Sequence, residues 1–328
     1  MFRNLFLALV MMAMPPLAQA APAKQHILFV APHPDDEVLG TGAQIWKAQQ
    51  RGDDYKVVIV TCGDAYDEAL AAWKNSKAAK DLNGDGKIDY LDLGIARHDE
   101  TLAALKVLGV AEDKVIFLGY PDGGLRKMYG TTPYKSEFTG VNAVPYDFAY
   151  RKGAPYTDEA AVEDLTKIIR ELNPKTVYST TPTEEHDDHA TTSEFVSRAL
   201  KRAGGKRKHL DYLVHWEHHV PAWPGSGATW TQPAGHIAAD VSSDLKDLGM
   251  SRDLKVQAIK LYATNGRHGR LSVGLRQGFG NFLASARLGG GLFEVMVLGR
   301  EGRRSPLWAK SLGGSSPSVK AVAEAWGP

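Results

Sequence analysis

Short apolar runs alternate along the chain with segments whose apolar residues recur three and four positions apart. The runs predict β-strands, and the segments with helical spacing predict amphipathic helices between them. The predicted strands cover residues 26–32, 55–61, 114–118, 176–180 and 212–215. The predicted helices cover residues 38–50, 69–80, 97–108, 158–172 and 190–202. This alternation is typical of an α/β fold with a doubly wound, mostly parallel, Rossmann-like sheet and helices on both faces.

Two stretches depart from the alternation. Residues 125–156 are rich in Gly, Pro, Thr and Tyr without clear periodicity, and are too long for a plain connection, so we expect a loop over the functional site. After Asp240 the chain becomes irregular and glycine-rich, with one further strand expected in LFEVMVLG. No linker separates two domains. We therefore expect a core over residues 24–235 and a C-terminal extension over 236–328 that packs on the same domain.

The first 20 residues have the features of an export signal. Arg3 is followed by a short apolar stretch and by the small-residue cleavage pattern Ala18-Gln19-Ala20. The sequence therefore predicts a secreted or periplasmic protein whose mature chain has no membrane span, with a retained anchor as the alternative. The single cysteine, Cys62, cannot form an internal disulfide and is expected to be a small buried residue.

Composition bounds the class of partner. The chain has 328 residues, of which 43% are hydrophobic, enough for a sizeable core. Lys and Arg number 39 against 38 Asp and Glu, so no basic field exists to attract a phosphate backbone. Nucleic acid is not expected as a partner, and a small molecule or a glycan is.

Polar clusters follow the first and fourth predicted strands, at the point where each strand ends. His33, Asp35 and Asp36 come after the first, and His186 and His189 stand three apart after the fourth. Ligands of open parallel sheets bind outside the carboxyl ends of the strands, where both clusters are expected to lie. Imidazole and carboxylate are zinc ligands, so the two clusters together predict a metal site. The alternative is helix-capping residues and a surface histidine pair.

The motifs resemble those of a known family. PHPDDE after a first strand, with HDDH downstream, is similar to the PIG-L or LmbE-like family of zinc-dependent de-N-acetylases. The resemblance extends through RHDETLAALKVLGV and FLGYPDGGL, and more weakly through KVQAIKLYATN and FLASARLGGGLFEVM. It covers most of the chain from His26 onward. One departure is Asp187, at a position where proline is common in the family.

The resemblance implies a role for each matching residue. The implied zinc ligands are His33, Asp36 and His189. Asp35 would be the general base on the zinc-bound water, His186 would stabilise or protonate the tetrahedral intermediate, and Asp188 would orient His186. Arg97 and Asp122 would face the substrate.

The activity that the resemblance implies is hydrolysis of an acetamide, usually on an N-acetylglucosamine unit, which releases acetate and a free amine. The actual substrate, the oligomeric state and the metal loaded in the cell are not identified by any residue. Aromatic residues and histidines at 212–224 fit a sugar site or a rigid corner equally well, and His218 and His219 receive no role. A catalytically inactive, calcium-dependent protein that binds a glycan or another protein is the alternative function.

The stretch DLNGDGKIDYLD has the spacing of an EF-hand calcium loop. Oxygen-bearing side chains stand at positions one, three, five, nine and twelve, with Gly86 at position six for the sharp turn. The expected calcium ligands are Asp81, Asn83, Asp85, the Lys87 carbonyl, Asp89 and Asp92. A structural Ca²⁺ within an enzyme is the prediction, and an acidic surface loop without an ion is the alternative.

Overall fold

The computed structural model describes residues 23–182, 184, 186–212, 214, 237–240, 249–262, 264 and 297–299. Its centre is a sheet with the strand order β3-β2-β1-β4-β5-β7-β6. The strands are β1 (His26–Ala31), β2 (Asp54–Thr61), β3 (Val115–Tyr120), β4 (Thr176–Thr180), β5 (Lys208–Tyr212), β6 (Ile237–Asp240) and β7 (Val297–Gly299). The first five pair in parallel, whereas β7 pairs antiparallel with β5 and with β6. The predicted α/β fold is confirmed.

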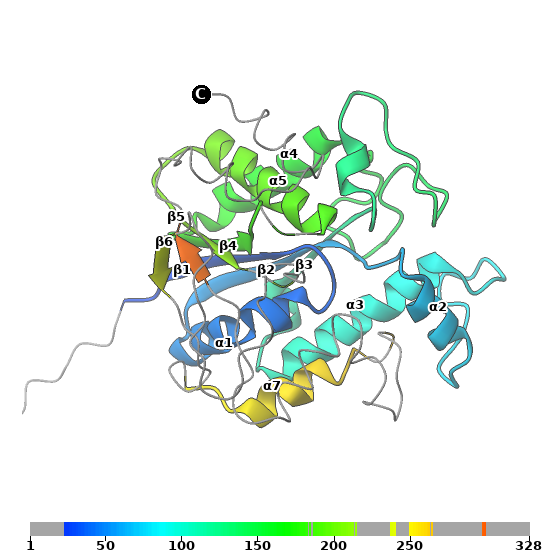
Figure 1. Ribbon diagram of the computed structural model, residues 1–328, viewed down its shortest axis with the longest axis horizontal. Helices are drawn as coiled ribbons and strands as arrows, with labels where there is room; N and C mark the ends of the chain where they lie inside the picture. The colour runs from blue at the N-terminus through cyan, green and yellow to red at the C-terminus, as the bar shows by residue number, and fades with distance from the viewer. Residues whose placement is uncertain are drawn as a thin grey trace, which may run out of the picture.

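Helices cover both faces of the sheet (Figure 1). The described helices are α1 (Asp36–Arg51), α2 (Asp67–Lys74), α3 (Tyr90–Val107), α4 (Asp158–Leu172), α5 (Asp187–Ala203) and α7 (Arg252–Ile259), with short 3₁₀ turns at Glu112–Lys114 and Leu125–Met128. Helices α1, α3 and α7 lie on one face, and α4 and α5 on the other.

Strand β1 shows why both faces must be covered. Its residues are almost all buried, and successive side chains point to opposite faces of the sheet. Ile27 and Phe29 belong to the core under α1, α3 and α7, whereas Leu28 and Val30 belong to the core under α4 and α5. A continuous apolar run is what a strand buried on both sides requires.

Some predicted boundaries were wrong. The fifth strand was expected at 212–215 but spans Lys208–Tyr212, because it pairs in register with β4 from Thr176 to Thr180. The helix expected from Arg97 begins at Tyr90 instead, since Asp89 and Asp92 form a capping box at its start. Helix α2 ends at Lys74, six residues before the predicted end.

The C-terminal part contributes to the same sheet and helix layer. Strands β6 and β7 extend the sheet beyond β5, and α7 packs against α1 and α3. The domain limits at 24–235 and 236–328 stay a prediction, because most of the extension lies outside the described residues. The export segment at 1–20, His218 and His219 also lie outside them.

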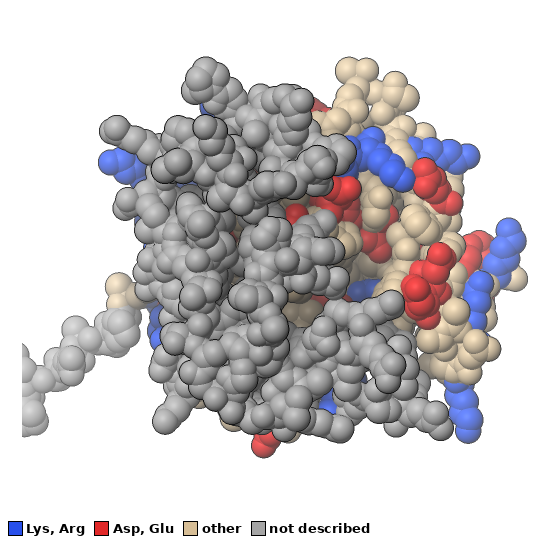
Figure 2. Space-filling model, viewed as in Figure 1, with Lys and Arg blue, Asp and Glu red and all other residues tan. Residues whose placement is uncertain are grey.

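The surface is not dominated by one sign of charge. Lys and Arg side chains are interspersed with Asp and Glu over the part of the face in Figure 2 that the structure describes. Among the described helices, none is both long and apolar enough to cross a bilayer.

Candidate metal centre

The fold brings the two polar clusters together at one edge of the sheet. Strands β1 and β4 are parallel neighbours, and the chain leaves their carboxyl ends toward α1 on one face and α5 on the other. This is the topological switch point, where open α/β sheets form their binding crevice.

The first cluster occupies the turn between β1 and α1. Asp36 is the first residue of α1, and its Oδ2 accepts a hydrogen bond from the backbone N–H of His33 at 3.1 Å. Free N–H groups at a helix start favour a carboxylate there. Asp36 is thus fixed with its carboxylate facing back toward His33.

The second cluster opens α5. His186 is the N-cap, and its Nδ1 accepts the backbone N–H of Asp188 at 3.2 Å. His189 is the third residue of the helix and is fully buried. Its backbone carbonyl accepts the hydroxyl of Thr180, the last residue of β4, at 2.7 Å.

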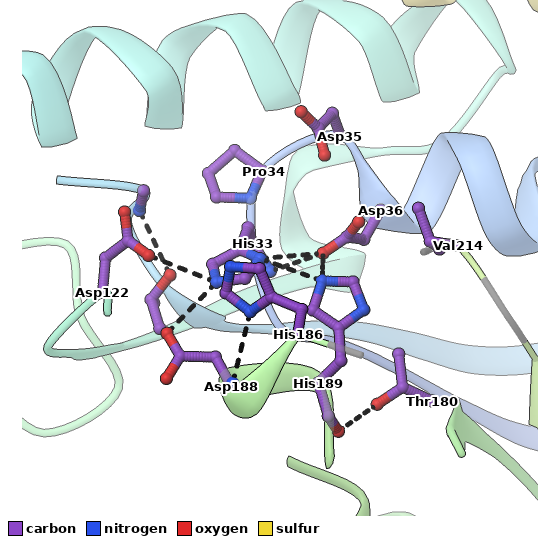
Figure 3. A network of polar contacts seen from close by, with 12 residues as sticks. His33, Pro34, Asp35, Asp36, Asp122, Thr180, His186, Asp188, His189 and Val214 are labelled. Carbon is purple, nitrogen blue, oxygen red and sulfur yellow. Dashed lines mark hydrogen bonds and ion pairs between the residues drawn. The ribbon is translucent and has the colours of Figure 1, made fainter. Parts of the chain in front are cut away.

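Three predicted ligand atoms converge between these helix starts (Figure 3). Asp36 Oδ2 lies 3.1 Å from His33 Nδ1 and 3.1 Å from His189 Nε2, and the two nitrogens are 3.2 Å apart. In a tetrahedral site with bonds of about 2.0–2.1 Å, neighbouring ligand atoms stand roughly 3.3 Å apart. The triangle therefore fits zinc with these three ligands and leaves a fourth position open.

The ligand side chains and their neighbours shift one another's pKa values because they lie so close together. Burial lowers the pKa of His189, but Asp36 and Glu184 outweigh burial and raise it to about 9. Burial alone would raise the pKa of Asp36, whereas the two histidines hold it well below its usual range. Zinc binds the neutral imidazole, so zinc binding would release the proton that the raised pKa favours on His189.

Carboxylates outside the triangle contact the other ring nitrogen of each histidine ligand. His33 Nε2 lies 3.2 Å from Asp122 Oδ1 and 3.2 Å from Asp188 Oδ2, and His189 Nδ1 lies 3.0 Å from Glu184 Oε1. Burial acts to lower the pKa of His33, but Asp122, Asp188 and Asp36 raise it well above its ordinary value. Carboxylates in this position fix the tautomer and the orientation of metal-binding imidazoles.

Glu184 was missed by the sequence reasoning. It stands two residues before the HDDH motif, yet nothing in its spacing pointed to a ligand contact. Its Oε1 also accepts the backbone N–H of Val214 at 2.5 Å, so it ties the His189 ring to the chain after β5. That contact depends on the packing of β5 against β4.

Asp188 and Asp122 lie against His33. The Asp188 carboxylate accepts the backbone N–H groups of Gly123 at 2.7 Å and Leu125 at 3.1 Å, besides its contact with His33. Asp122 accepts the N–H of Ala65 at 2.9 Å. Asp188 contacts His186 by donating its backbone N–H, so the predicted roles of Asp188 and Asp122 stay predictions.

His186 stands beside the triangle. Its ring lies 4.8 Å from the His33 ring and 5.0 Å from the His189 ring, centre to centre. His33, His186 and His189 each place a ring nitrogen within 4.8 Å of the others, as do the donor atoms of His33, Asp122 and Asp188. His186 is thus placed to contact a group bound at the metal.

Asp35 and Arg97 form a buried pair next to the ligands. Arg97 Nη2 donates to the Pro34 carbonyl at 2.8 Å and lies 3.4 Å from Asp35 Oδ2. A Cβ at Gly63 would stand 2.5 Å from Arg97 Nε, so only glycine leaves room for the guanidinium. Arg97 thus holds both the turn and the carboxylate of the predicted base.

The sequence of residues 28–200 matches the model of the family PIG-L, GlcNAc-PI de-N-acetylase. The chain belongs to the PIG-L family. It is 30% identical over 185 residues to the 1D-myo-inositol 2-acetamido-2-deoxy-alpha-D-glucopyranoside deacetylase of Mycobacterium leprae, covering 54% of this chain and 51% of that protein. The enzyme of the same name from Rhodococcus erythropolis is 29% identical over 213 residues, 64% and 59% of the two chains.

The chain therefore spans about half the length of the curated relatives it matches. A solved structure, a deacetylase–teicoplanin complex in the biosynthesis pathway of teicoplanin, superposes with a TM-score of 0.50 at 23% identity, covering 83% of this chain and 96% of that one. At this identity the likeness supports the fold. The PIG-L match includes the turns that carry both metal-binding clusters.

The predicted calcium loop lies apart from this centre, between α2 and α3. Asp81 accepts the N–H groups of Gly84 and Gly86, at 2.6 and 2.8 Å, and Asp92 accepts those of Leu82 and Asn83, at 2.6 and 3.0 Å. The two groupings of metal-binding side chains found among the described residues both lie at the sheet edge. The loop is held by hydrogen bonds from its backbone N–H groups to its own carboxylates, and calcium stays a prediction.

Proposed function

We propose that the protein is a zinc-dependent hydrolase that removes the acetyl group from an N-acetylglucosamine-type sugar. The observation that carries the proposal is the triangle of His33, Asp36 and His189 donor atoms, with Asp35 in the same turn, directly before Asp36. Membership of the PIG-L family and the names of the deacetylases that the chain resembles support the same reaction.

Zinc, when bound, would lower the pKa of a coordinated water toward about 7 and polarise the acetamide carbonyl. Asp35 takes a proton from the attacking water, since Arg97 keeps a positive charge beside its carboxylate. His186 stands where it can hydrogen-bond the oxyanion, and it delivers a proton to the departing amine. The balance is one acetamide and one water consumed, with one acetate and one amine formed.

The substrate class follows from the site and the relatives. A 2-acetamido sugar carries the acetamide that this chemistry needs, and the named relatives act on such a sugar linked to inositol. Because the chain matches only about half of those proteins, the inositol part is not carried over.

We also propose that the protein is exported and that it holds a structural calcium ion. Export is supported by the charged, apolar and small-residue order of residues 1–20, and N-terminal sequencing of protein from the producing cell should find a mature start near Ala21. Structural calcium is supported by the EF-hand spacing of residues 81–92, and its test is a thermal melt.

The deciding experiment couples metal analysis to acetate release. Purified protein is loaded with zinc and offered chitin fragments, peptidoglycan fragments and simple N-acetyl sugars. We expect about one zinc per chain and acetate release from at least one substrate, lost in Asp35→Asn. Protein that holds zinc but releases no acetate from any of them would instead be a binding protein of this fold.

A further inference from the structure

Asp35 has an unusual backbone conformation. Its φ is 107° and its ψ is −33°, and only one other non-glycine residue in the described part of the chain, Asn173, has a positive φ. Such conformations are strained and persist only where surrounding contacts enforce them. Because φ and ψ of Asp35 set the direction in which its side chain leaves the turn, those contacts determine where the predicted base points.

The groups that hold this turn can be named. The Asp35 carbonyl accepts the N–H groups of Val38 at 3.0 Å and Leu39 at 2.8 Å, which is the ordinary start of α1. The Asp35 N–H donates to Glu37 Oε2, in the first turn of α1, at 3.0 Å. Glu37 is fully buried, so no bulk water can replace it there.

Glu37 is held in turn by the C-terminal part of the chain. The Tyr262 hydroxyl donates to Glu37 Oε1, across 225 residues of sequence. Tyr262 is 5% exposed and packs in the core with α1 and α3. It lies beyond the PIG-L match, which ends at residue 200.

The segment that carries Tyr262 is itself bonded to both helices around the base. Lys255 is fully buried and donates to the Leu39 carbonyl of α1 at 2.9 Å. The backbone N–H and the hydroxyl of Thr264 donate to Glu100 of α3 at 2.8 and 2.6 Å. Glu100 lies less than one turn from Arg97, the other residue that contacts Asp35.

We propose that Glu37 and Tyr262 are positioning residues for the base: the C-terminal segment holds the Asp35 backbone through a Tyr262–Glu37–Asp35 hydrogen-bond chain. This inference rests on the proposed function in taking Asp35 as the base. The chain of contacts itself is independent of any bound metal or substrate, so it can be tested separately.

The first test removes only the hydroxyl, with Tyr262→Phe. The matched control is Tyr55→Phe, which removes the hydroxyl of another buried tyrosine. That hydroxyl donates to Gln49 at 2.8 Å, and Tyr55 stands at the start of β2, away from the carboxyl ends of the strands where the metal centre lies. For Tyr262→Phe we expect kcat to fall roughly tenfold with KM and zinc content unchanged, because misplacement of a catalytic group affects the chemical step. Tyr55→Phe should leave kcat within twofold of wild type, which corresponds to a change of less than about 0.4 kcal/mol in activation free energy.

The second test reads the Asp35 amide directly by hydrogen exchange. Tyr262→Phe removes the group that holds the acceptor, and Glu37→Ala removes the acceptor itself. In both variants this N–H should exchange at least about tenfold faster than in wild type. Glu37→Gln keeps an acceptor for the N–H and should restore protection and most of kcat. A purely structural role would lower the melting temperature without these selective effects.

The outcomes are separable from the fate of the proposed function. Unchanged Asp35 exchange in Tyr262→Phe, or a kcat loss no larger than in Tyr55→Phe, overturns the positioning role. If wild-type protein releases no acetate at all, the proposed function fails, and the exchange measurement still decides whether the hydrogen-bond chain holds the turn.

Discussion

Asp188→Asn should weaken zinc binding although Asp188 is outside the ligand triangle. When His33 Nδ1 binds the metal, Nε2 carries a proton and donates to a carboxylate. The Asp188 side chain is 2% exposed and is surrounded by three donors, the N–H groups of Gly123 and Leu125 and His33 Nε2. An asparagine offers one oxygen and an NH₂ group that cannot accept, so at least one donor loses its partner.

The magnitude follows from those contacts. Losing one hydrogen bond to a charged acceptor costs about 1.5–3 kcal/mol. At about 2–4 °C per kcal/mol for a chain of this size, the metal-free melting temperature should fall by roughly 3–12 °C. Loss of the carboxylate behind His33 should weaken zinc affinity by roughly 10–100-fold.

The assay is zinc competition against a chromophoric chelator, beside thermal melts of metal-free and zinc-loaded protein. The control is Asp187→Asn, which removes the carboxylate of the neighbouring residue. Because Asp187 is exposed, this change should alter the free energy of unfolding by less than about 0.5 kcal/mol. If Asp188→Asn binds zinc as tightly as Asp187→Asn and melts at the same temperature, the support of His33 by Asp188 is refuted.

Three further predictions concern other parts of the molecule. Asp35→Asn should keep a full complement of zinc and lose most turnover, whereas His189→Ala should lose the metal; equal zinc loss in both, by metal analysis, would reverse the assignment of base and ligand. Burial and a neighbouring carboxylate raise the pKa of Asp64 to about 7. At this site the folded protein therefore keeps a proton that the unfolded chain releases near pH 4, so the contribution of Asp64 to stability falls as pH rises from about 4 to about 7, and Asp64→Asn should remove that part of the pH dependence of the melting temperature. Calcium should raise the melting temperature of the zinc-loaded wild type but not that of an Asp81→Ala, Asp85→Ala double variant. If both respond identically, the segment is an acidic surface loop that binds no calcium.

The sequence by itself determined which residues gather at the metal centre. Periodicity located β1 and β4, and the polar residues that directly follow each strand had to lie at the same edge, because parallel neighbours end together. The types of side chain at those ends, imidazole and carboxylate, then indicated a metal. Local sequence and the direction of the strands thus placed His33, Asp35, Asp36, His186 and His189 at one edge, and the choice of His33, Asp36 and His189 as the ligands came from the resemblance to the PIG-L family.

Tertiary structure alone decided which groups support those ligands and where some elements lie. Asp122 reaches His33 from just after β3, and Tyr262 reaches Glu37 from beyond α7. The register of β5 was likewise set by its pairing with β4 rather than by its own apolar residues. Each of these depends on how segments distant in sequence pack against one another, which the spacing of residues along the chain does not reveal. The contact of Glu184 with His189 is local, but it depends on how the loop before α5 folds back onto the helix start.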